Sequence, residues 1–223
     1  MSICWLAGCS HHHIRVIAGV SVRFFYATVH KVLRAINNCE QLQLKFPTTK
    51  EDMQHIALGF KKISNDGIIT GCIDCIDGWL CPINVPKKNE VGRVTAFYSG
   101  HYAQYGINVQ ACCDYISQFT AFSVMNPGGT GDALAYQRWK LSSALEAIDG
   151  PYFVAGDNAY VQAKHLMTPF NKLELQLNPQ ARDIYNFHLS QLRIDVEMVF
   201  GLLVNKWGIL KRNLQVSFIL LLM

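Results

Sequence analysis

Apolar residues recur at helical spacing in the first part of the chain. Residues 14–38 hold a short apolar segment, then Gly19 and Ser21, then a longer segment with a period of three to four residues. Gly19 suits a left-handed cap that ends the first helix, and Ser21 is a typical N-cap for the second. The apolar positions of the second helix are Val22, Phe25, Val29, Val32, Leu33 and Ile36. A short helix, a turn and a longer helix form the outline of a helix-turn-helix.

The polar positions of this second helix leave two interpretations open. Its exposed face is expected to consist of residue types that contact phosphates and bases, namely Arg23, Tyr26, His30, Lys31 and Arg34. The alternative is an ordinary helical hairpin that packs on the rest of the chain. One more helix is predicted within residues 46–64, with Thr49 as its N-cap and Asp52 three residues later. Residues 1–66 are therefore expected to form a helical, helix-turn-helix-like N-terminal region.

From residue 67 the pattern becomes that of a sheet. Strands are predicted within residues 67–86, within 107–129 (two strands joined by a turn near 114–118) and within 152–160. In the last of these ranges the apolar run ends on Asp157. Helices are predicted for residues 130–148, capped by Thr130 with Asp132 at the positive end, for 163–170 and for 178–210. Three meandering strands followed by alternating helix and strand predict a mixed α/β sheet covered by helices.

Composition narrows the class of protein. Half of the 223 residues are hydrophobic and 16% are charged, which suits a folded core and excludes a disordered charged chain. The net charge of +4 is compatible with a polyanionic partner. No apolar run approaches the ~18 residues of a membrane-spanning helix, so no membrane association is expected. The eight cysteines are interpreted as reduced thiols; Cys72 and Cys75 are expected to point to opposite faces of a strand, which disfavours a shared zinc ion.

Three acidic residues stand on different predicted elements. Asp77 lies in or at the end of the first strand, Asp157 ends a later strand, and Glu197 lies on the long helix, 197 − 157 = 40 residues further on. Each has a simpler explanation when taken alone. Asp77 fits an Asp-Gly turn, Asp157 a turn, and Glu197 a helix-surface pair with Arg193, while Asp132 fits the start of a helix. No G-x-S-x-G sequence and no phosphate-binding loop is present.

Five blocks in fixed order resemble a known family. They are "GCIDCIDGW", "SGHYAQYGINVQACCD", "NPGGTGDALAY", "YFVAGDNAYV" and "NFHLSQLRIDVEMVFGLLVNKWGIL". The chain resembles the DDE superfamily endonucleases, specifically the transposase-derived nuclease domain of Harbinger-type elements. The resemblance extends over roughly residues 5–212.

The resemblance implies a ribonuclease-H-like fold and a set of site residues. Asp77, Asp157 and Glu197 correspond to the catalytic, metal-binding carboxylates, and Asp132 to a fourth acid that is also a candidate metal ligand. Asp74 competes for the first position, but the Asp-Gly pair at 77–78 fits the family better. The implied cofactor is Mg²⁺ or Mn²⁺, because a pair of such ions activates water and stabilises the leaving oxygen in phosphodiester cleavage.

Two local departures from the family pattern leave these acids in place. Asp195 stands where a basic residue is more usual, and Trp79 stands where a small polar residue is more common.

The resemblance also implies DNA as the substrate and the nucleus as the location. It leaves room for a separate DNA-binding partner protein and for a homo-oligomer. In this interpretation residues 67–212 form the endonuclease domain, and residues 213–223 form an apolar end that looks truncated. The first alternative is an inactive or domesticated transposase remnant that binds DNA or protein. The second is a helix-turn-helix regulator that acts through residues 14–36.

Overall fold

The structure is a computed structural model that describes residues 1–214, apart from the side chain of Asp195. The predicted apolar end at 213–223 therefore lies almost wholly outside the described residues. The helices are α1 (Ser2–Leu6), α2 (His11–Ile17), α3 (Val22–Asn37), α4 (Lys50–Ile63), α5 (Asp132–Arg138), α6 (Lys140–Glu146), α7 (Lys172–Leu175) and α8 (Pro179–Lys206), with 3-10 turns η1 (Glu40–Leu42), η2 (Asn65–Gly67), η3 (Val94–Phe97) and η4 (Gly208–Lys211). The strands are β1 (Cys72–Pro82), β2 (Tyr98–Ser99), β3 (Gln104–Cys113), β4 (Phe119–Pro127), β5 (Phe153–Ala155) and β6 (Leu166–Met167).

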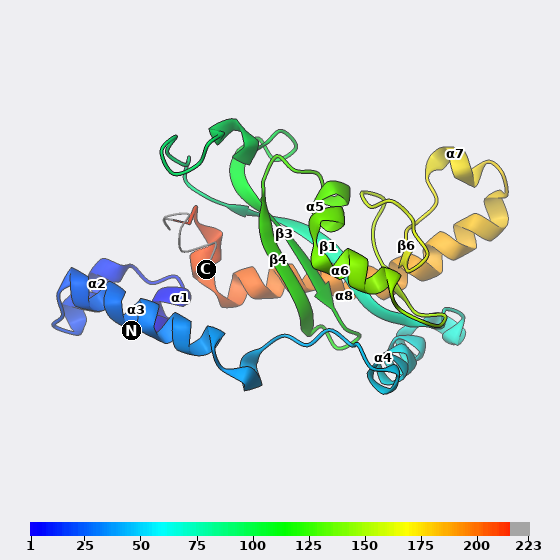
Figure 1. The fold of residues 1–223 in the computed structure, drawn as a ribbon, viewed down its shortest axis with the longest axis horizontal. Helices are drawn as coiled ribbons and strands as arrows, with labels where there is room; N and C mark the ends of the chain where they lie inside the picture. The colour runs from blue at the N-terminus through cyan, green and yellow to red at the C-terminus, as the bar shows by residue number, and fades with distance from the viewer. Residues whose placement is uncertain (215–223) are drawn as a thin grey trace.

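The described strands form one mixed, six-stranded sheet. Strand β1 pairs antiparallel with β3, and β3 pairs antiparallel with β4. On its other side β1 pairs in parallel with β5, which pairs in parallel with β6. Helix α8 passes along one face of this sheet, whereas α5 and α6 lie over the other (Figure 1). The expected ribonuclease-H-like mixed sheet flanked by helices is confirmed.

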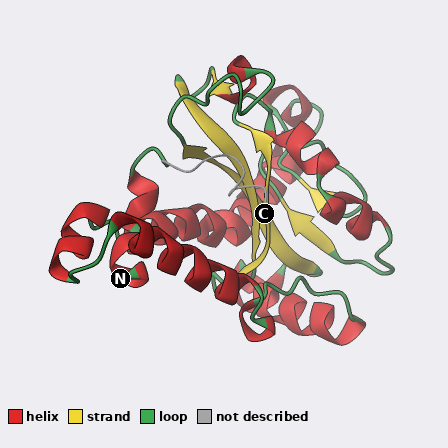
Figure 2. Cartoon of the chain, turned by 60° about the vertical axis from the view of Figure 1, so that its left-hand side comes forward, coloured by secondary structure: helices red, strands yellow, loops and turns green. Residues whose placement is uncertain are grey.

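Figure 2 shows helices on both sides of the sheet, and apolar side chains are buried on each of its two faces. On the α8 face, Leu189, Leu192 and Val196 pack against β1 and β5. On the α6 face, Leu141 and Leu145 pack against the opposite side of the same strands. Helix α4 packs against β1 and contributes Phe60 to the first of these clusters and Met53 to the second. Because β1 is covered on both faces over most of its length, its sequence is largely apolar and is interrupted by Asp74 and by Asp77-Gly78.

The N-terminal helices follow the predicted capping. Gly19 has a φ of +63°, and the Ser21 hydroxyl accepts a hydrogen bond from the Phe24 backbone N–H at 3.2 Å, so α2 and α3 meet at 105°. Phe25 of α3 is buried and meets Trp5 of α1 edge to face at 6.3 Å. The three helices pack mainly on each other and reach the rest of the chain through α1 and η4. Of the expected exposed face, Arg23, Lys31 and Arg34 are exposed, whereas Tyr26 and His30 are half-buried.

No single helix within residues 1–214 has the length and hydropathy to cross a membrane. Within the same residues, only the bent pair of α2 and α3, counted together, has the required length and composition.

Three local predictions are wrong. Residues 163–170 contain strand β6 instead of a helix, because Leu166 and Met167 pair with β5 and Leu166 is fully buried. Residues 130–148 form two helices, which are separated at Trp139, where ψ is 132°. Helix α5 takes Gly131 as its N-cap, without a side-chain cap, so Thr130 does not cap it.

Cys72 and Cys75 also depart from the expectation. Both are buried in the same part of the core, beneath α8. The register of β1 against β5 shifts between Cys72 and Asp74, and this irregularity breaks the strand alternation on which the prediction rested.

Candidate active site

Sheet register brings Asp77 and Asp157 to neighbouring positions. The last parallel pair between β1 and β5 is Cys75 with Ala155, and each acid follows that pair by two residues on its own segment. Asp77 lies inside the continuous strand β1, where the next residue, Gly78, pairs with Gln110. An Asp-Gly turn at this position is therefore excluded, and the two carboxylates lie side by side at the sheet.

Asp157 is also a turn former. Its Oδ1 accepts a hydrogen bond from the Ala159 N–H at 3.0 Å, and its carbonyl accepts one from the Tyr160 N–H at 3.3 Å. The turn explanation and the site explanation are thus compatible, because the turn holds the acid immediately after β5.

Glu197 reaches the same region from α8. Arg193, one turn earlier, donates from Nη2 to Glu197 Oε1 at 3.3 Å. The Glu197 side chain is 61% exposed and that of Arg193 only 11%, so the guanidinium lies beneath the carboxylate. The helix-surface pair expected from the sequence is present, but its arginine is buried against the acids.

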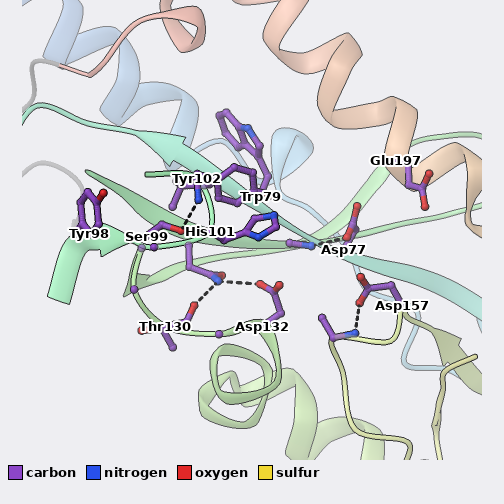
Figure 3. A pocket seen from close by; sticks show the side chains of 18 of the residues that line it. Asp77, Trp79, Tyr98, Ser99, His101, Tyr102, Thr130, Asp132, Asp157 and Glu197 are labelled. Carbon is purple, nitrogen blue, oxygen red and sulfur yellow. Dashed lines mark hydrogen bonds between the residues drawn. The ribbon is translucent and has the colours of Figure 1, made fainter. Parts of the chain in front are cut away.

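All four predicted acids line one cavity of about 620 Å³. Figure 3 shows Asp77, Asp157 and Glu197 directed toward a common space, with Asp132 beside them. Residues 98–102 and the glycine-rich residues 128–131 form its other walls. Trp79, which departs from the family pattern, also lines the cavity, and its ring packs on Phe200 of α8 at 5.8 Å.

The acids influence one another electrostatically. The pKa of Asp77 is raised to about 6, chiefly by burial and to a smaller extent by the charges of Asp157 and Glu197. The Gly78 N–H, 2.9 Å from Asp77 Oδ1, and the charge of Arg193 oppose this rise in pKa. The pKa of Asp77 therefore depends on both other acids, because the three carboxyl groups surround one space.

Asp132 is held by two side-chain amides. Its Oδ1 accepts from Asn108 Nδ2 at 2.9 Å and from Gln110 Nε2 at 2.8 Å. It also lies close over Gly78, because a Cβ added to that glycine would stand 2.4 Å from Asp132 Oδ1. The glycine after Asp77 thus makes room for the fourth acid.

The family model described as DDE superfamily endonuclease matches residues 76–222, which is most of the chain. The chain belongs to this family. No curated protein and no solved structure matches it significantly. The expected resemblance is confirmed, and the family match begins one residue before Asp77.

The family implies a divalent metal ion, and the acidic residues at this cavity fit one chemically. Carboxylate oxygens are the ligands that hard divalent cations prefer. The charges of Asp157 and Glu197 contribute to the raised pKa of Asp77, and this concentration of negative charge is one that a cation would neutralise. Among the residues whose side chains the structure describes, no three metal-ligating side chains are grouped closely enough to hold an ion as they stand.

Asp74 lies apart from the cavity that the four acids line. Its side chain is fully buried and accepts hydrogen bonds from Thr120 Oγ1 at 2.5 Å and from the Cys75 N–H at 3.0 Å. Burial raises the pKa of Asp74 well above its usual value. The structure thus separates the two competing acids, with Asp77 in the cavity and Asp74 in the core.

Sequence reasoning missed the polar residues that support the acids. Asn108 and Gln110 are the polar members of the otherwise apolar run "INVQACC" and share one face of β3. That i, i+2 spacing of amides inside a buried strand was a usable signal. Tyr160, three residues after Asp157, gave no such signal, because a tyrosine after a strand is ordinary.

Proposed function

We propose that this chain is a divalent-metal-dependent DNA endonuclease whose site consists of Asp77, Asp157 and Glu197 with Mg²⁺ or Mn²⁺. One observation carries the proposal: three acids far apart in sequence (157 − 77 = 80 and 197 − 157 = 40) line a single cavity. A strand, a strand end and a helix hold them, so the arrangement does not depend on one flexible loop.

The side chains have separable tasks in this proposal. Bound cations supply an activated water and a stabilised leaving oxygen for phosphodiester cleavage. Asp77, with a pKa raised to about 6, is mostly ionised above that pH in the metal-free protein and there offers a charged ligand to a cation. Asp157 is oriented by its turn, and Glu197 by α8. The buried guanidinium of Arg193 limits the excess of negative charge around them.

DNA in the nucleus is the proposed substrate. The transposase origin of the family supports it, and the net charge of +4 is compatible with a polyanion.

Calorimetric titration with Mn²⁺ tests the site directly. We expect binding by the wild-type protein, its loss in Asp157→Asn, and unchanged binding in Asp149→Asn, a control at an exposed acid away from the cavity. Cleavage of supercoiled plasmid should follow the same order and stop in EDTA. A folded wild-type protein that binds no Mn²⁺ would overturn the proposal and leave the inactive remnant that binds DNA or protein.

A further inference from the structure

A chain of hydrogen bonds runs beside the four acids, and the proposed chemistry does not use it. The Tyr160 hydroxyl donates to Gln110 Oε1 at 2.6 Å, and Gln110 Nε2 donates to Asp132 Oδ1 at 2.8 Å. Gln110 is fully buried and Tyr160 is 4% exposed. Water cannot readily replace a lost partner at such positions, so these hydrogen bonds are more restrictive than exposed ones.

The direction of each hydrogen bond follows from the chemistry of its ends. A carboxylate only accepts, so the amide nitrogen of Gln110 must face Asp132. The amide oxygen then faces Tyr160, whose hydroxyl must donate. Burial first, and then the charge of Asp132, raises the pKa of Tyr160, which keeps that hydroxyl protonated. The amide of Gln110 therefore has one orientation that satisfies both neighbours.

Asn108 completes the network. Gln110 Nε2 also donates to Asn108 Oδ1 at 2.7 Å, and Asn108 Nδ2 donates to Asp132 Oδ1 and to the Thr130 carbonyl, each at 2.9 Å. Both hydrogens of each amide are thus used. A fully satisfied buried network of this kind holds its members in one arrangement.

The network joins two segments that carry acids. Tyr160 closes the turn of Asp157 through its own N–H, and its ring meets Tyr136 of α5 edge to face at 6.0 Å. Asp132 begins α5 on the other side of the same hydrogen bonds. Between them Gln110 lies in β3, paired with both β1 and β4. The position of one acid is therefore mechanically linked to that of the other.

We propose that Gln110 and Tyr160 are positioning residues of the nuclease site, which hold the turn carrying Asp157 in register with Asp132 across the sheet. The inference rests on the proposed function, because it assigns these residues a task in that site. Neither side chain is proposed to touch substrate or metal.

Two near-isosteric variants and one matched control test the inference. Tyr160→Phe removes the hydroxyl and keeps the ring, and Gln110→Met keeps the volume and removes the amide. Thr120→Val is the control, since it removes an equally buried hydrogen bond, to Asp74, outside the cavity. Calorimetry should show Mn²⁺ affinity about tenfold weaker in Gln110→Met, the lower end for loss of a residue that orients metal ligands. Tyr160→Phe should weaken it less, and Thr120→Val should leave it unchanged at a similar loss of thermal stability.

Hydrogen–deuterium exchange gives a readout that needs no metal. In the metal-free protein we expect faster exchange across residues 156–162 and 128–133 in both network variants, and wild-type exchange there in the control. A double variant should lose little beyond Gln110→Met alone, because the two residues act through one chain. In cleavage assays kcat should fall in both network variants while the KM for DNA stays constant. Thr120→Val, with a similar loss of thermal stability, should keep the wild-type kcat, so that a smaller folded fraction does not account for the fall.

The outcomes separate this inference from the proposed function. If the wild type binds Mn²⁺ and all three variants bind it with the wild-type affinity, the positioning role is overturned and the nuclease proposal stands. If the wild type does not bind Mn²⁺, the nuclease proposal is overturned. The role of Gln110 and Tyr160 in catalysis is then overturned as well. In that case exchange still decides whether the network holds the two acidic segments, and unchanged exchange rejects that as well.

Discussion

Burying the ionised carboxylate of Asp77 costs free energy of folding. Its pKa of about 6 lies above the usual 3.8, chiefly because burial disfavours the carboxylate. A folded-state pKa above the unfolded value means that the folded protein binds the proton more tightly. The contribution of Asp77 to stability is thus fully present below about pH 4 and is lost as the pH rises through about 6.

Asp77→Asn should therefore stabilise the metal-free protein at pH 7.5. The gain is expected to be about 3 kcal/mol, because the rise in the pKa of Asp77 from 3.8 to about 6 no longer opposes folding. Urea unfolding at pH 7.5 and at pH 4 measures it, and the gain should nearly vanish at the lower pH. Equal stability of wild type and variant at pH 7.5 would show that the acid is not strained in the fold.

The same acid predicts how cation binding depends on pH. Mn²⁺ affinity should fall as the pH decreases through about 6, since a protonated Asp77 no longer offers a charged ligand. Titrations at pH 5, 6, 7 and 8 measure the midpoint. A midpoint near pH 4 would assign binding to acids with ordinary pKa values.

Arg193 should control that midpoint. Its positive charge holds the pKa of Asp77 down, so Arg193→Gln should raise the pKa of Asp77 above the wild-type value. NMR titration of the Asp77 carboxyl in metal-free protein measures the change. Arg182→Gln is the control on the same helix, because Arg182 lies over the Phe170 ring, away from the cavity. An equal pKa in all three proteins would mean that Arg193 acts only on Glu197.

At the scale of elements, β1 brings Asp77 and Asp132 together through the lack of a side chain at Gly78. An alanine there would place its Cβ 2.4 Å from Asp132 Oδ1 and 2.9 Å from Gln110 Nε2. Both groups are held by hydrogen bonds and cannot simply turn away.

Gly78→Ala is therefore expected to destabilise the protein by about 1–3 kcal/mol, the usual range for overpacking in a buried site. Gly92→Ala is the matched control, because a Cβ at Gly92 meets nothing within 4 Å. Urea unfolding compares the two variants. A Gly78→Ala protein as stable as the control would show that Asp132 can leave the strand without cost.

Local signals predicted the elements that local chemistry determines. Ser21 and Thr49 cap the helices that they were expected to cap, because N-capping needs only neighbours in sequence. Strand β6 was missed because Leu166 takes its conformation from pairing with β5 rather than from its own neighbours.

The candidate site divides in the same way. The four acids could be picked out from blocks of sequence, and the structure gathers them at one cavity. Their supporting groups depend on contacts between distant segments, such as the hydrogen bond from Tyr160 to Gln110, 160 − 110 = 50 residues apart. No local pattern specifies such a contact.

At the scale of the whole molecule, the N-terminal helices stand to one side of the sheet, apart from α5 and α6 (Figure 1). Lys31 and Arg34 are exposed on α3 and remain the candidates for contacts with DNA phosphates. Neither residue lines the cavity, so they form a second surface that a long DNA molecule is able to contact.

The double variant Lys31→Glu/Arg34→Glu should weaken duplex DNA binding about tenfold at low salt and make the salt dependence shallower. Mn²⁺ binding should be unchanged. Fluorescence anisotropy in EDTA measures DNA binding without cleavage, and Lys61→Glu/Lys62→Glu on α4 introduces the same charges at another exposed site. Equal affinities for the two double variants would favour the ordinary helical hairpin over the helix-turn-helix.

The parallel pairing of β1 with β5 also sets when the site can exist. During synthesis Asp77 leaves the ribosome 80 residues before Asp157 (157 − 77 = 80), and Glu197 follows 40 residues later (197 − 157 = 40). Until β5 docks beside β1 and α8 covers that face, the first acid has neither partner. A nascent chain thus has no assembled set of acids until Glu197 has been made and α8 has packed against the sheet.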